Sequence, residues 1–224
     1  MWRALTRWCV GVAAVAATFV CGRAEAHGFL AVPAARNVQH NSDWCPHCLS
    51  AGGAAATSKG RFGVCGDPWA GPRHHEAFGK YATPVRIAGR YRASGDIPVR
   101  VVLTANHRGR WSLRLCPLSG AASQATERRE LTQACLNAHR LQRSDGHGPF
   151  THVPSEASDF RVSYRLPRGV KCKRCVLQWI YETANSCMPR GIPRAFTSQG
   201  LKTCGQPGAP PMEMFVNCAD VTIT

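Results

Sequence analysis

The chain of 224 residues carries 28 Lys and Arg against 13 Asp and Glu, a formal charge of +15, and it contains 12 cysteines. Hydrophobic residues make up 44% and charged residues 18%, a globular composition that excludes a transmembrane bundle, a coiled coil, a collagen-like fibre and a disordered acidic tail. The length suits one domain or two small ones.

Residues 1–26 have the pattern of a secretory signal peptide. Two arginines lead into an apolar run over residues 8–21, and Ala24-Glu25-Ala26 is a cleavage site of the A-x-A type. The run is too short to cross a bilayer comfortably. We therefore expect a secreted, extracellular protein that starts at His27 and has one domain over residues 27–224, with no membrane association after cleavage.

The predicted elements that follow are mostly short strands. Apolar and polar residues alternate, or apolar residues run on, over residues 97–105, 111–115, 162–166, 175–181 and 215–224. Helical periodicity is poor, and Glu127 to Arg140 is the only candidate helix. Gly and Pro turns and long loops separate the strands. The pattern predicts an all-β fold, an antiparallel β-sandwich of the immunoglobulin or fibronectin-III type with long disulfide-stapled loops.

The cysteines support an exported protein. Cleavage would remove Cys9 and Cys21 and leave ten cysteines, which predicts up to five disulfides whose pairing the sequence does not give. The motif Cys45-Pro46-His47-Cys48 is similar to that of disulfide oxidoreductases but lacks a βαβ context. A zinc knuckle formed with Cys172 and Cys175 is disfavoured by their separation and by export.

His27 offers chemistry that an internal histidine does not. A free α-amine can lose its proton near neutral pH, and the ring Nδ1 can chelate the same ion. A second imidazole would complete a T-shaped site of three nitrogens, which suits copper. His107, at the end of the predicted strand 97–105, is the best second ligand.

The chain after residue 26 resembles the lytic polysaccharide monooxygenases of auxiliary-activity family 15. The resemblance spans nearly the whole chain after residue 26, in the right order. It is carried by His27-Gly28-Phe29-Leu30 with Pro33 and Arg36, Val64-Cys65-Gly66-Asp67-Pro68-Trp69, Pro72-Arg73, His75-Glu76, Gly79 to Thr83, Leu103 to His107, Gly109, Arg114 to Pro117, Leu166-Pro167, Gly169, Cys172, Cys175 to Trp179, Tyr181, Asn185-Ser186, Phe215 and Cys218 to Val221.

The resemblance implies a site and an activity. His27, through its amine and Nδ1, and His107, through Nε2, would form a histidine brace around one copper ion. Phe215 would shield the axial position of the copper ion, and Ala105 would limit access to its open position. Gln178 is a weaker candidate for a place beside the site, because its neighbour Trp179 competes for the inward face of the same strand. The implied reaction uses an external electron donor and hydrogen peroxide or dioxygen to cleave crystalline chitin or cellulose at C1 or C4, with chitin ahead of cellulose.

The chain also departs from the family pattern. Relatives usually have Cys-Gly-Gly where this chain has Cys45-Pro46-His47-Cys48, and they often have a Cys where this chain has Phe62. Cys48 would then replace the lost partner as a relocated bridge. His75-Glu76 is better explained as a loop-ordering pair than as a metal pair, and His47 as a solvated loop residue.

Other functions are left open or disfavoured. We expect a monomer and no nucleic-acid partner, because no nucleic-acid module is present and most arginines alternate with core residues along strands. Trp44, Trp69 and Trp111 could pack in the core or stack on sugar rings. The alternative to an enzyme is a non-catalytic polysaccharide-binding or copper-binding protein on the same scaffold.

Overall fold

A computed structural model describes residues 27–224 apart from residues 40–44, 46, 77 and 120–122. The predicted signal peptide, residues 1–26, lies outside the described residues. The described elements are β1 (His27–Val32), α1 (Arg36–Gln39), α2 (Ala54–Thr57), β2 (Ile87–Tyr91), β3 (Asp96–Ala105), β4 (Arg110–Leu118), α3 (Gln124–Glu130), α4 (Gln133–Ala138), β5 (Gln142–Arg143), β6 (Phe150–His152), β7 (Asp159–Arg165), β8 (Cys172–Glu182), the 3-10 turn Arg194–Phe196 and β9 (Met214–Ile223).

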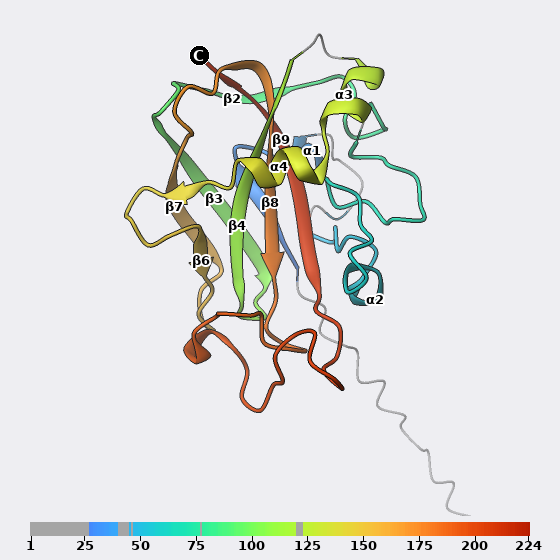
Figure 1. The fold of residues 1–224 in the computed structure, drawn as a ribbon, viewed down its shortest axis with the longest axis vertical. Coiled ribbons are helices and arrows are strands. Elements are labelled where there is room, and N and C mark those ends of the chain that lie inside the picture. Colours follow the sequence, from blue (N-terminus) through green and yellow to red (C-terminus); the bar gives the residue numbers. More distant parts are fainter. Residues whose placement is uncertain (1–26, 40–44, 46, 77, 120–122) are drawn as a thin grey trace, which may run out of the picture.

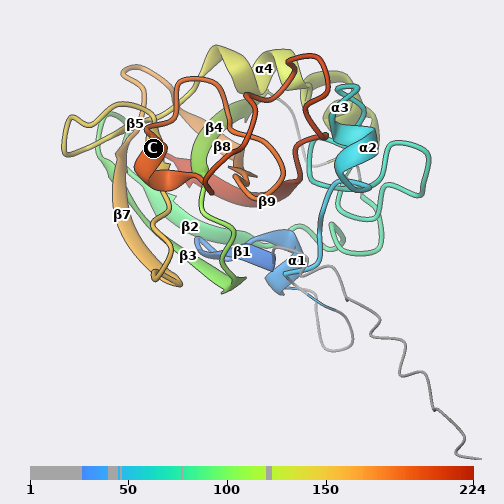
Figure 2. The ribbon, with the colours of Figure 1, turned by 90° about the horizontal axis from the view of Figure 1, so that it is seen from below.

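These strands form a sandwich of two sheets, as predicted (Figure 1). A four-stranded sheet has the order β1-β3-β7-β5, and a five-stranded sheet has the order β2-β9-β8-β4-β6. The view from below shows the two layers, with segment 183–213 lying across the ends of β4, β8 and β9 (Figure 2). One detail differs from the prediction of an antiparallel fold, since the edge strand β2 pairs with β9 in parallel.

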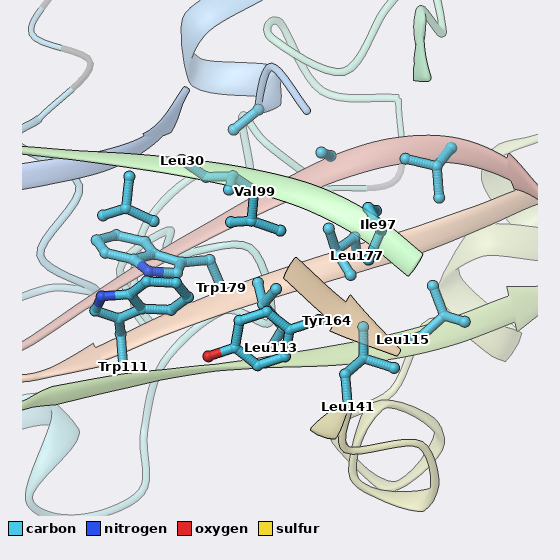
Figure 3. Close-up of a cluster of buried hydrophobic side chains, with 14 of the residues drawn as sticks. Leu30, Ile97, Val99, Trp111, Leu113, Leu115, Leu141, Tyr164, Leu177 and Trp179 are labelled. Carbon is cyan, nitrogen blue, oxygen red and sulfur yellow. The ribbon is translucent and has the colours of Figure 1, made fainter. Parts of the chain in front are cut away.

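Alternation along β3 explains the core between the sheets. Ile97, Val99, Val101 and Leu103 are buried, while the intervening side chains face outward, because successive residues of a strand point to opposite faces. The opposite sheet contributes large buried side chains to the same core, among them Trp111 and Trp179 (Figure 3). The core is therefore built from the strands that the sequence pattern predicted.

The predicted helix over Glu127 to Arg140 is two helices. α3 ends at Glu130, and the hydroxyl of Thr132 accepts a hydrogen bond from the backbone N–H of Cys135 at the start of α4. A capping threonine favours a helix start, because it satisfies a backbone donor that has no partner within the helix. The chain therefore breaks at Leu131 and Thr132.

Five disulfides join all ten cysteines after residue 26, as the cysteine count predicted. They pair Cys45 with Cys48, Cys65 with Cys218, Cys116 with Cys135, Cys172 with Cys175, and Cys187 with Cys204. The bridge of Cys48 to Cys45 agrees with a relocated bridge. Since every one of these sulfurs is oxidised, neither a zinc knuckle nor a dithiol is present.

Two arginines depart from the expectation of a solvated basic face. Arg36 and Arg174 are buried and both contact Glu127 and Asp220, which are also buried. The four side chains connect α1, α3, β8 and β9, and their formal charges cancel. Among the described residues, none of the helices is both long enough and apolar enough to cross a membrane.

Candidate metal site

The pairing of β1 with β3 brings the two candidate ligands to the same end of the sandwich. His27 lies opposite Ala105 in the antiparallel register, and His107 follows two residues later. Residues directly opposite each other in such a pair have their side chains on the same face. Ala105 therefore places a small methyl group beside the His27 side chain.

Close packing behind His27 requires a glycine at position 28. A Cβ atom on Gly28 would lie 2.4 Å from Cδ2 of Leu103 and 3.2 Å from the carbonyl oxygen of Val102. Real side chains do not approach so closely, so only glycine lets β1 lie against this part of the core. The position of His27 depends on this approach.

The ring of His107 is held from its Nδ1 side. Nδ1 lies 2.6 Å from the side-chain amide of Asn185 and 3.6 Å from Oε2 of Glu213. The backbone N–H of His107 donates to the Tyr181 hydroxyl, 3.2 Å away, and that hydroxyl donates to the carbonyl of Arg108, 2.6 Å away. Burial raises the pKa of Tyr181, so its hydroxyl keeps its proton.

This arrangement fits a metal bound at Nε2 of His107. Hydrogen-bonding one ring nitrogen of a histidine selects which nitrogen is left for a metal. The oxygen and nitrogen of an Asn amide exchange by a half-turn, and with its oxygen toward Nδ1, Asn185 would accept a hydrogen bond from Nδ1–H of His107. Nε2 would then carry a lone pair, and a set of nitrogen donors from His27 and His107 suits copper.

Phe215 lies next to His27. Its ring centroid is 6.2 Å from that of His27 and 6.2 Å from that of Tyr181, and the side chain is buried. A phenyl ring offers no ligand atom, so Phe215 can cover the site only with apolar surface. The structure thus brings together four of the residues predicted from sequence: His27, Ala105, His107 and Phe215.

Gln178 does not belong to this group. Its side-chain amide donates to the carbonyl of Val64, 2.7 Å away, and to Gln133 of α4, 3.0 Å away. The neighbouring Trp179 occupies the inward face of β8, so Gln178 points to the opposite face, under α4. The expectation that Gln178 lies beside the metal site is therefore wrong, because the competing inward residue is Trp179.

Sequence reasoning missed three side chains at this end of the sandwich. Asn185 and Glu213 contact Nδ1 of His107, and the position of Glu213 two residues before Phe215, with the same strand parity, could have indicated it. His47 is the third: its ring centroid lies 5.2 Å from that of His27. Burial and the nearby His27 lower the pKa of His47, so it is not simply a solvated loop residue.

The remaining candidates have structural roles or lie on the surface. His75 is buried and its Nδ1 lies 2.8 Å from Asp67, which also accepts the His75 backbone N–H at 2.9 Å, in agreement with a loop-ordering role. Trp111 packs in the core, whereas 54% of Trp69 is exposed, with the Arg73 guanidinium 5.2 Å from its ring centroid. Trp44 lies outside the described residues.

Comparisons with known proteins show the family and the fold. The family model described as "Lytic polysaccharide mono-oxygenase, cellulose-degrading" matches residues 27–221. The solved structure of a lytic polysaccharide monooxygenase of family AA15 from Thermobia domestica, in the Cu(I) state, is 28% identical, with a TM-score of 0.70, and the match covers 88% of this chain and 98% of that one.

Two other solved structures are more distant. A chitin-binding domain from Burkholderia pseudomallei is 12% identical, with a TM-score of 0.46, over 89% of this chain and all of the other. The cellulose-active enzyme CelS2 in complex with copper is 17% identical, with a TM-score of 0.43, over 88% of this chain and 98% of that one. No curated protein matches the chain.

Proposed function

Because the chain belongs to the family of lytic polysaccharide monooxygenases, we propose that it is a secreted copper enzyme that oxidatively cleaves a β-1,4-linked polysaccharide, chitin or cellulose, at C1 or C4. The proposal includes removal of residues 1–26, one copper ion held by His27 and His107, an external electron donor, and hydrogen peroxide or dioxygen as co-substrate. The enzyme acts as a monomer of one domain.

The observation that carries the proposal is the pairing of His27 with Ala105. It sets the first residue of the proposed mature chain beside the end of β3, which His107 follows. Cleavage after Ala26 would create the α-amine that a three-nitrogen site needs. The family match starts at residue 27, which supports the same boundary.

The residues of this chain divide the work at the site. When bound, copper would supply one-electron redox chemistry that activates the co-substrate toward a C–H bond of the sugar. Asn185 and Glu213 hold the ring of His107, and Tyr181 fixes its backbone. Phe215 covers the site with apolar surface. Rigid support of this kind keeps ligands in a productive geometry.

The surface around the site is suited to a sugar polymer. Segment 183–213 crosses the same end of the sandwich (Figure 1), and the Cys187–Cys204 bridge closes a large part of it. A pocket of about 390 Å³ in this segment is lined by the polar side chains of Arg194, Thr197, Ser198 and Gln199 and by the apolar side chains of Met188 and Leu201. The polar side chains can form hydrogen bonds with hydroxyl and amide substituents.

The test is oxidative cleavage by the exported protein. The amino terminus is first verified at His27 by mass spectrometry, and the copper-loaded protein is incubated with chitin and with cellulose, each with and without ascorbate. We expect aldonic-acid or C4-oxidised oligosaccharides that require both copper and reductant. His107→Ala should abolish them, while His147→Ala, an exposed histidine on another loop, should leave them unchanged.

The other results separate the alternatives. Tight copper binding with no oxidised product from either polymer would favour a binding or carrier protein on the same scaffold. Oxidised products that survive His107→Ala would place the chemistry elsewhere. A protein that starts at His27 and binds no copper would overturn the proposal.

A further inference from the structure

A third imidazole packs against the candidate metal site. The rings of His47 and His27 have centroids 5.2 Å apart and planes inclined by 82°, an edge-to-face contact between aromatic rings. His47 is half-buried. Its position next to a candidate ligand calls for an explanation of what holds it there.

Backbone hydrogen bonds tie the His47 segment to two strands. The N–H of Gly28, in β1, donates to the carbonyl of His47 at 3.2 Å, and the N–H of Val216, in β9, donates to the carbonyl of Leu49 at 3.3 Å. Leu49 is buried. Residues 47–49 therefore join the strand that carries His27 to the strand that carries Phe215.

The Cys45–Cys48 disulfide closes the turn that contains His47. Within the turn, the N–H of Cys48 donates to the carbonyl of Cys45 at 3.1 Å. Ligand atoms of Cys45, His47 and Cys48 lie within 4.8 Å of one another, but a disulfide has no thiolate to offer a metal. The imidazole is thus the functional group that the closed turn presents.

The ring of His27 contacts two other rings, those of His47 and Phe215. An unrestrained imidazole rotates broadly about its χ2 bond, whereas chelation by the amine and Nδ1 together allows only a narrow range of ring orientations. Packing against two rings restricts that rotation before any metal binds. Preorganisation of this kind lowers the cost of ordering on binding.

We propose that His47 is a positioning residue, whose ring, held by the Cys45–Cys48 turn, orients the imidazole of His27 for metal binding. This inference rests on the proposed function for its metal, but the contact between the two rings itself involves no metal atom. Partners that orient metal-binding histidines typically contribute about 10-fold to 100-fold in metal affinity. Loss of the His47 ring should therefore weaken copper binding about 10-fold.

The variants separate the ring from its nitrogens. His47→Ala removes the ring, His47→Phe keeps an aromatic edge without nitrogen, and His47→Asn keeps polarity without a ring. All three retain the backbone carbonyl to which Gly28 donates, and circular dichroism and thermal unfolding check that each is folded. His147→Ala, on another, exposed loop, is the matched control.

Two measurements are made on protein that starts at His27. In the metal-free protein, NMR detects nuclear Overhauser effects between the two imidazoles and the mobility of the His27 ring. With copper, calorimetry gives the affinity and EPR the Cu(II) spectrum. In the parent we expect Overhauser effects between the two rings. In His47→Ala and His47→Asn we expect a more mobile His27 ring, about 10-fold weaker copper binding and a changed EPR spectrum. His47→Phe should restore the ring rigidity, the copper affinity and the EPR spectrum of the parent.

The inference is overturned if the parent shows no Overhauser effect between the rings, or if His47→Ala leaves the His27 ring as rigid as in the parent. It is also overturned if copper affinity and EPR spectrum are unchanged in His47→Ala while the parent binds copper. A parent that binds no copper instead refutes the proposed function, and the NMR result still decides the role of His47.

Discussion

Replacing Asp220 by Asn tests whether the buried charge cluster of Arg36, Arg174, Glu127 and Asp220 stabilises the fold. Oδ2 of Asp220 accepts from Nε of Arg36 at 2.8 Å, and Oδ1 accepts from Arg36 at 2.9 Å and from Nε of Arg174 at 2.9 Å. The Asn amide nitrogen would replace one acceptor with a donor facing guanidinium groups. Its neutral side chain would also leave one positive charge of the cluster without a counterion.

The expected cost follows from this burial. The side chains of Arg36, Glu127 and Asp220 are at most 2% exposed, and removing one partner of a buried ion pair typically costs about 3–5 kcal/mol. For a chain of this size each kcal/mol lowers the melting temperature by about 2–4 °C. Calorimetric unfolding should therefore show Asp220→Asn melting about 6–20 °C below the parent.

Two further variants make the result specific. Asp159→Asn breaks the exposed pair with Arg100 and should leave the melting temperature near that of the parent, because exposed ion pairs contribute little. Arg174→Met combined with Asp220→Asn removes one charge of each sign and should recover part of the loss. The reasoning is refuted if Asp220→Asn shifts the melting temperature no more than Asp159→Asn, or if the double variant melts no higher than Asp220→Asn.

Three other results are expected from the same structure. Burial alone would raise the pKa of Asp220 above 3.8, but the two neighbouring arginines lower it. The stability that the ionised Asp220 contributes is therefore present above about pH 4 and is lost as the pH falls through the lowered pKa. Urea denaturation across about pH 2–6 should accordingly show the stability difference between the parent and Asp220→Asn shrinking in acid. Gly28→Ala places a Cβ 2.4 Å from Leu103 and should lower both the melting temperature and copper affinity, and an alanine variant with parent values for both would contradict the packing argument. Tyr181→Phe removes a buried acceptor and donor at His107 and should cost about 1–3 kcal/mol in unfolding experiments, with a changed Cu(II) EPR spectrum; an unaltered spectrum would show that the hydroxyl does not help to fix His107.

Alternation is clearest in the sequence where a strand has one exposed face. In β3, buried residues such as Val99 and Val101 alternate with outward-facing ones such as Arg100, so the period of two is visible in the sequence. β9 is buried along its whole length, and its sequence showed only a partial alternation, with Ala219, Val221 and Ile223 in step. In β8 the same two-sided burial meant that Trp179 competed with Gln178 for the inward face, which made Gln178 the weaker site candidate.

The charge cluster escaped prediction because its partners are far apart in the sequence. Arg36 and Asp220 are separated by 184 residues, and Arg36 and Glu127 by 91. Arginine is mostly found at protein surfaces unless it is paired, and no local spacing reveals a pair of this kind. The expectation of solvated arginines therefore holds for strand residues such as Arg100 and fails for Arg36 and Arg174.

The candidate site divides in the same way between local and distant signals. His27 is marked by its place after a cleavage motif, and His107 by its place at the end of a strand, so both could be predicted without knowing their neighbours. The side chains that hold their rings are His47, from the segment between α1 and α2, and Asn185 and Glu213, from the two ends of segment 183–213; only the folded sandwich brings them to this end. Substitution of a ring-holding residue should therefore change the orientation of a ligand and weaken metal binding by a limited factor, whereas substitution of His27 or His107 removes a nitrogen donor and should abolish the site.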